Sequence, residues 1–150
     1  SMLGAIMLFT AQGVPMLYAG QEFGANGPKT IDQNKLHWNY LDGDAGQALY
    51  KHYAALAYLR HTQGALQGNN FEPLLADHER KLLAYQRWTD DGSIVVVAVN
   101  LAREPQRATI AFPRPGVWHE WLHDYDEQIG EEPHAVEIPD SFGKIWVFKG

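Results

Sequence analysis

The hydrophobic pattern of the sequence changes its period near residue 66, and this change limits the possible folds most strongly. Before that point, apolar residues recur at helical spacing. After Gly68 they follow a period of two and turn residues recur, which is typical of β-strands. The pattern therefore predicts two regions, 1–66 and 67–150. Strands are expected near residues 71–76, 81–89, 93–101, 106–112, 117–123, 135–138 and 144–149.

The regular spacing of these strands predicts an antiparallel sandwich or barrel. Asp91-Gly92 is a strong hairpin signal between two of them. Residues 94–99 are apolar without interruption, so this strand should lie at the centre of its sheet with both faces covered.

The first region predicts a smaller α/β unit. Residues 3–12 are expected to form a buried helix, and residues 14–19 a short buried strand between glycines. A second helix should begin at Asp44, whose side chain can cap it, and stop at Gly64. Residues 20–43 form a long, turn-rich connection, and loops of such length in compact domains are usually functional.

The composition excludes several classes of partner. The chain has 12 Lys and Arg against 18 Asp and Glu, a net charge of −6, so neither nucleic acid nor an anionic membrane surface is an expected partner. It contains no cysteine, which excludes disulfides and leaves the compartment open. The apolar stretch 2–19 is broken by Gly13 and Pro15 and no basic residue precedes Lys29, so it predicts neither a signal peptide nor a membrane span. No cofactor or metal is predicted.

Residues 13–24 read GVPMLYAGQEFG, and this segment resembles the eighth-strand segment of the α-amylase family, glycoside hydrolase family 13, which carries Gly-x-Pro-x-x-Tyr-x-Gly-x-Glu there. Residues 6–10 resemble the helix before that strand, 36–38 the loop beyond it, and 49–60 the last barrel helix. The β-rich remainder resembles the C-terminal domain of these enzymes. The resemblance implies a mainly β chain with an α/β remnant: two helices and the last strand of an incomplete (β/α)8 barrel, followed by a Greek-key antiparallel β-sandwich.

The resemblance also implies a retaining enzyme that acts on α-glucans, with an α-amylase as the first choice. The family's nucleophile Asp, acid/base Glu and stabilising Asp follow the fourth, fifth and seventh barrel strands, and this chain begins after the seventh. Retaining hydrolysis needs two carboxyl groups about 5–5.5 Å apart, whereas only Glu22 lies just beyond a predicted barrel strand. We therefore expect no catalytic residue here and no activity from the chain alone. Its expected partners are the rest of its barrel and, through the whole enzyme, an α-glucan.

Two residues of the predicted rim are candidates for substrate contact. Glu22 could touch a sugar, although anchoring its own loop through backbone donors is the commoner role for such a carboxylate. Trp38 could stack on a glucose ring, although packing beneath the loop is the commoner role for an aromatic side chain.

Residues 119–123 read HEWLH, and on a helix the two histidines would share one face and could hold zinc in the manner of a metalloprotease. Pro113, Pro115 and Gly116 favour a β-type segment instead, so a chance match on a strand is preferred. Acidic residues between 124 and 132 predict a solvated loop.

A non-catalytic carbohydrate-binding module is the alternative of a different class. Strand aromatics are the candidate platform for it, although such side chains are mostly core. The four tryptophans concerned are Trp88, Trp118, Trp121 and Trp146.

An apolar strand without neighbours is an association hazard. We therefore expect the two helices to cover the sandwich and residues 3–19 to contact another copy of the chain or to rearrange.

Overall fold

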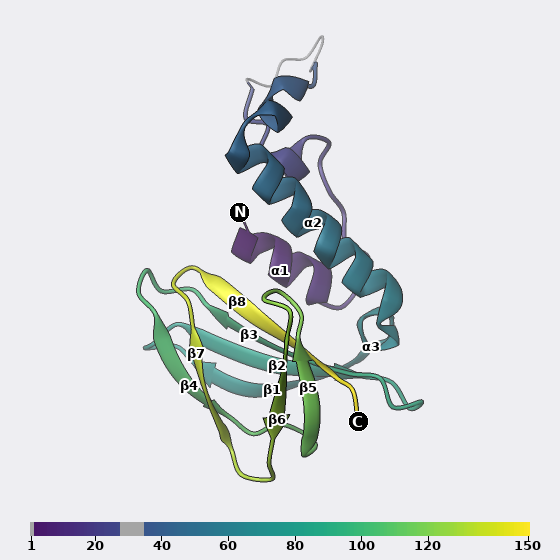
Figure 1. Cartoon of the computed structure of the whole chain (residues 1–150), viewed down its shortest axis with the longest axis vertical. Helices are drawn as coiled ribbons and strands as arrows, with labels where there is room; N and C mark the ends of the chain where they lie inside the picture. Colours follow the sequence, from purple (N-terminus) through teal and green to yellow (C-terminus); the bar gives the residue numbers. More distant parts are fainter. Residues whose placement is uncertain (1, 28–34) are drawn as a thin grey trace.

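The computed structural model describes residues 2–27 and 35–150, and in it helices lie over one side of a β-rich body (Figure 1). Residues 28–34 of the predicted rim loop lie outside the described residues. The helical elements are α1 (Met2–Thr10), η1 (Gln21–Phe23), η2 (Trp38–Asp42), α2 (Asp44–Thr62) and α3 (Gly64–Gln67). The strands are β1 (Asn70–Asp77), β2 (Leu82–Trp88), β3 (Ile94–Asn100), β4 (Gln106–Ile110), β5 (Gly116–Glu120), β6 (Tyr125–Ile129), β7 (His134–Ile138) and β8 (Phe142–Phe148).

The strands form two antiparallel sheets that pack face to face. The larger has the order β1-β2-β3-β8-β5-β6, and the smaller pairs β4 with β7. The interior strand β3 pairs with β2 on one side and β8 on the other. Every residue of β3 is buried, which confirms the predicted central strand. The mainly β sandwich preceded by helices agrees with the predicted fold class.

The two faces of the large sheet contribute to two separate cores, because successive side chains of a strand point to opposite faces. On one face Val95 and Val97 pack with Ile6 of α1 and Leu56 of α2. On the other, Val96 belongs to a core shared with β4 and β7. The uninterrupted apolar run of β3 is therefore needed to fill both cores, and the helices do cover the sandwich as predicted.

Two arginines hold the C-terminal end of α1 against the rest of the chain. Arg60 of α2 donates to the carbonyl oxygens of Phe9 at 2.7 Å and Ala11 at 3.0 Å, and also to that of Gly13. These carbonyls have no partner within the helix, and a cation there also suits the negative end of the helix dipole. Burial lowers the pKa of the Arg60 guanidinium.

The second arginine, Arg87 of β2, is completely buried. It donates to the carbonyl oxygens of Thr10 at 2.8 Å, Asn70 at 2.9 Å and Gly68 at 2.5 Å. Burial, and next the charge of Arg60, lower the pKa of this guanidinium. Arg87 therefore links α1, the end of α3 and the first strand around one side chain.

The prediction of a strand at residues 14–19 is wrong for this chain. No part of this segment is a strand, and all its side chains except that of Pro15 are exposed, with Val14 at 95% and Met16 at 83%. A strand is defined by hydrogen bonds to a neighbouring strand, and none of residues 2–27 and 35–150 pairs with this segment.

The helix ends also differ from the prediction. The N-cap of α2 is Gly43, without a side-chain hydrogen bond, and Asp44 is the first helical residue. Gln63 ends α2, so that Gly64 begins α3 instead of stopping the helix. Within the described ranges, no helix is long and apolar enough to cross a membrane.

The predicted strand 117–123 is too long. In the structure β5 ends at Glu120, a turn follows, and β6 begins at Tyr125 inside the segment predicted as an acidic loop. Asp126 of β6 accepts a hydrogen bond from His119 Nδ1 of β5 at 2.7 Å and contacts Lys149 at 3.1 Å. These contacts, the His119 hydrogen bond first, lower the pKa of Asp126. Cross-strand partners thus let acidic residues occupy an edge strand.

Candidate functional site

The predicted rim lies at the N-terminal end of α2, at the end of the molecule away from the sandwich (Figure 1). Both η1 and η2 pack on α2. Gly20 and Gly24 flank η1 with φ angles of 91° and 78°, which favour glycine. A Cβ atom on Gly20 would lie 2.8 Å from Ala25 Cβ and 3.0 Å from Leu36 Cδ2. The rim is therefore folded too tightly at Gly20 to accept another side chain.

Glu22 turns back on its own loop. Its Oε2 atom accepts a hydrogen bond from the backbone N–H of Gly20 at 2.9 Å. The neighbouring Gln21 donates through Nε2 to the Tyr53 hydroxyl of α2 at 3.1 Å and accepts from the N–H of Tyr18 at 3.3 Å. These contacts anchor η1 to α2 and fix where the Glu22 carboxylate lies.

Trp38 opens η2 and is 62% exposed. Its ring centroid lies 5.4 Å from that of the buried Phe23, with the planes inclined by 33°. Glu22 and Trp38 thus lie on two short helices that are joined through Phe23. One side of Trp38 packs on the rim, and much of the ring remains available to a ligand.

The HEWLH segment is not a helix. His119 lies in β5 and His123 in the turn after it. Glu120 between them is buried and accepts hydrogen bonds from the backbone of Ile145 at 3.1 Å and from His123 Nδ1 at 2.6 Å. Across the described part of the chain, no group of three or more His, Asp or Glu side chains is arranged to hold a metal ion. The helical zinc hypothesis is therefore wrong, and Glu120 ties the turn to β8.

The strand tryptophans divide by burial. Trp118 and Trp146 are completely buried between the sheets, so they offer no platform for a sugar. Trp121 packs against the helix-side core, opposite to Trp118, and donates to the carbonyl oxygen of Ala55 at 3.3 Å. Trp88 is half-buried at the end of β2.

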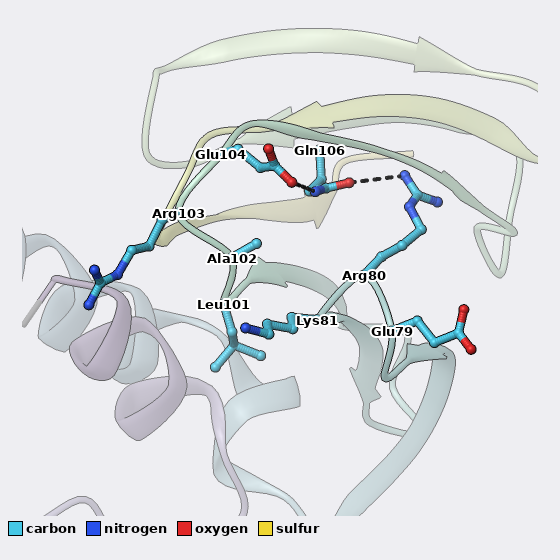
Figure 2. Close-up of a pocket in the computed structure, with 8 residues that line it drawn as sticks. All are labelled: Glu79, Arg80, Lys81, Leu101, Ala102, Arg103, Glu104 and Gln106. Atoms are coloured by element: carbon cyan, nitrogen blue, oxygen red, sulfur yellow. Dashed lines mark hydrogen bonds between the residues drawn. The ribbon is translucent and has the colours of Figure 1, made fainter.

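A polar cleft that the sequence did not indicate lies between the β1–β2 turn and the β3–β4 connection (Figure 2). Gln106 donates to Glu104 Oε1 at 3.2 Å and accepts from Arg80 at 3.4 Å, and Arg80 also donates to the carbonyl oxygen of Arg107. No aromatic side chain lines the cleft, and its side chains diverge in the view of Figure 2. It is therefore a poor platform for a sugar ring.

Comparisons with known proteins agree with this architecture. Residues 75–143 match the family described as alpha amylase, C-terminal all-beta domain. The chain is 34% identical over 111 residues to the alpha-amylase MalA of Haloarcula japonica, an alignment that covers 71% of this chain and 15% of that protein. It is 30% identical over 136 residues to neopullulanase 2 of Thermoactinomyces vulgaris, covering 90% of this chain and 22% of that protein.

The fold itself matches solved enzymes of this class. The alpha-amylase of Geobacillus thermoleovorans, complexed with acarbose, superposes with a TM-score of 0.81 at 21% identity, covering 99% of this chain and 33% of that one. The fold is that of the C-terminal part of these enzymes. The chain belongs to the α-amylase family, glycoside hydrolase family 13, and is a C-terminal part of such an enzyme. It spans less than a quarter of the length of either curated relative.

Proposed function

We propose that this chain is the C-terminal, non-catalytic part of a retaining enzyme that hydrolyses α-glucosidic bonds, as an α-amylase does. In this proposal residues 1–66 complete the catalytic barrel and residues 67–150 form the accessory β-sandwich. The reactive carboxylates belong to the remainder of the barrel, which is the chain's natural partner.

The exposure of Val14 and Met16 carries the proposal. These two apolar side chains are exposed to 95% and 83%, although burying each of them would be worth about 1.5–3 kcal/mol. The segment is held at both ends, by Arg60 at Gly13 and by the Gly20 turn at η1. An exposed apolar segment that is held at both ends is available to pair with neighbouring barrel strands.

Two rim residues would serve the substrate in different ways. Glu22, hydrogen-bonded to the Gly20 N–H, would set the shape of the rim without taking part in the chemistry. Trp38, largely exposed beside Phe23, would offer its indole face to a glucose ring, because the C–H groups of a pyranose pack well on an aromatic face.

The direct test is an assay of the purified chain for release of reducing sugar from starch. We expect none, because retaining hydrolysis needs a pair of carboxyl groups flanking the bond, and in this proposal those groups belong to the remainder of the barrel. A Glu22→Gln variant is the matched control. Starch hydrolysis by the wild-type chain that disappears in the variant would contradict the proposal.

A further inference from the structure

A second cleft lies at the opposite end of α2 from the rim, in the sandwich. It opens between the β2–β3 hairpin and the β4–β5 connection and has a volume of about 320 Å³. Its lining includes Gln86, Trp88, Thr89, Asp90, Ile94 and Arg114. Because α2 has 19 residues, about 28 Å of helix separates this end from the rim.

The wall of the cleft that matters most is the indole of Trp88. Strand alternation puts Gln86 and Trp88 on the same face of β2 as the buried Leu82 and Ala84. Trp88 packs against the core there, and its Cα pairs with that of Ile94. At this end of the strand the indole is only half-buried and lines the cleft.

The β2–β3 hairpin beside Trp88 carries two aspartates, and only one of them takes part in its hydrogen bonds. Asp91 accepts hydrogen bonds from the Thr89 hydroxyl and from the N–H of Ser93 at 3.4 Å, and the Thr89 contact lowers the pKa of Asp91. Asp90 makes no hydrogen bond or ion pair with the residues that the structure describes. Asp91 therefore shapes the turn, and the carboxylate of Asp90 is left for a ligand.

The opposite wall carries a guanidinium without a carboxylate partner among the described residues. Arg114 lies with its guanidinium 5.8 Å from the centroid of the Phe148 ring. Gln86 completes the polar lining; its Nε2 donates to Glu72 at 2.6 Å, which leaves its carbonyl oxygen as an acceptor.

This set of groups suits a neutral, hydroxyl-rich ligand. The lining includes one acidic and one basic residue, Asp90 and Arg114, so it carries no net charge that would select an ion. A concave site with an aromatic wall and a few placed polar groups is the usual form of a small-ligand site. The indole accepts the C–H face of a pyranose, while charged hydrogen-bonding groups bind its hydroxyls strongly. The cleft of Figure 2 has charged groups but no such wall.

We propose that this cleft, named here the Trp88 cleft, is a secondary binding site for a short stretch of an α-glucan. The choice of an α-glucan rests on the proposed function, while the fit to a sugar rests on the cleft itself. The site would hold a polymeric substrate on the sandwich, away from the barrel.

Isothermal titration of the whole chain with maltoheptaose tests the proposal. We expect binding, and we expect Asp90→Ala and Arg114→Gln each to weaken it by about tenfold, which is the loss of one charge-assisted hydrogen bond. Neither side chain belongs to the buried core, so both variants should fold. Tyr50→Ala, which removes a half-exposed aromatic residue of α2, is the control and should bind like the wild type.

Three results would overturn the proposal. The first is no heat of binding up to about 10 mM maltoheptaose, well above a millimolar Kd. The second is unchanged affinity in both cleft variants. The third is loss of binding in Trp38→Ala alone, which would place the ligand at the rim. None of these affects the starch assay, and starch cleavage by the chain would contradict only the proposed function.

Discussion

Two apolar runs of nearly the same length have opposite fates in this molecule. Residues 94–99 form most of β3 and are completely or almost completely buried, whereas Val14, Met16, Leu17 and Tyr18 of the run 14–19 are exposed. The difference lies in their neighbours, because β3 pairs with β2 and β8 and is covered by helices on one face and by β4–β7 on the other. Burial here is set by tertiary partners and not by local composition.

The contacts between the helical N-terminal region and the β-sandwich decide whether the two unfold together. Ile6 and Phe9 of α1 are buried in the core on the helix side of the large sheet, while the segment directly after α1 is exposed to solvent. Arg60 and Arg87 mark the boundary, since their guanidinium groups bind the carbonyl oxygens where α1 ends. The predictions below test this boundary, beginning with the largest expected effect.

The largest effect is expected from Arg87→Met. The substitution removes the donor from the buried carbonyl contact at Thr10 and from the part-buried ones at Gly68 and Asn70, and each buried group left unsatisfied costs about 1–3 kcal/mol. We expect the free energy of unfolding to fall by about 3 kcal/mol or more in urea denaturation.

Arg107→Met is the matched control for Arg87→Met. Arg107 pairs with Glu137 at 3.7 Å, and both side chains are largely exposed, so a change within about 0.5 kcal/mol is expected. If the two variants lost the same stability, Arg87 would not be what joins α1 to the sheet.

Replacing either of two glycines with alanine should have a smaller effect on stability than Arg87→Met. A Cβ atom on Gly143 of β8 would lie 2.8 Å from the carbonyl oxygen of Ala98 and 3.3 Å from Ile6 Cδ1. One on Gly46 of α2 would lie 1.9 Å from the carbonyl oxygen of Tyr40 in η2. We expect Gly143→Ala to lower the global stability by about 2 kcal/mol, as overpacking does. Gly46→Ala should instead displace η2 and leave the sandwich intact.

Hydrogen exchange separates these outcomes. Gly46→Ala should raise exchange in residues 35–43 alone, and Gly143→Ala should raise it in α1, β3 and β8. Gly4→Ala serves as the control within α1, since nothing lies within 4 Å of the added atom, and it should stabilise the helix by up to about 1 kcal/mol. Faster exchange throughout the sandwich in Gly46→Ala would show that the rim and the sandwich unfold together.

The sequence predicted those elements that carry a clear local pattern. β2 and β3 follow from the hairpin signal at Asp91-Gly92 and from the apolar run, and α2 follows from its periodicity. β6 was missed because its acidic residues resemble a solvated loop. Those residues have partners that the local pattern does not reveal: Glu127 binds His134 at 2.7 Å and Trp146 at 3.3 Å. Only the folded chain brings these groups together.

The candidate site shows the same limit. Glu22 and Trp38 were found because the segment around Glu22 has a recognisable pattern, and the structure supplies their contacts. Trp88 was one of four tryptophans considered as a sugar platform, but the cleft around it could not be predicted, because Asp90 and Arg114 are 24 positions apart and line it from a hairpin and a separate connection. A lone tryptophan at the end of a strand carries no signal that distinguishes a lining residue from a core residue.

The smallest effect on stability is expected in the exposed apolar run, residues 14–19. Val14→Ser combined with Met16→Ser should change the free energy of unfolding by less than about 0.5 kcal/mol, because exposed side chains contribute little. The same change should reduce self-association, which an unpaired apolar segment promotes. Light scattering over a range of concentrations measures this: we expect the wild-type chain to associate and the double variant to remain closer to a monomer. A wild-type chain that stays monomeric at every concentration would contradict this prediction. It would show that the exposure of residues 14–19 does not cause self-association.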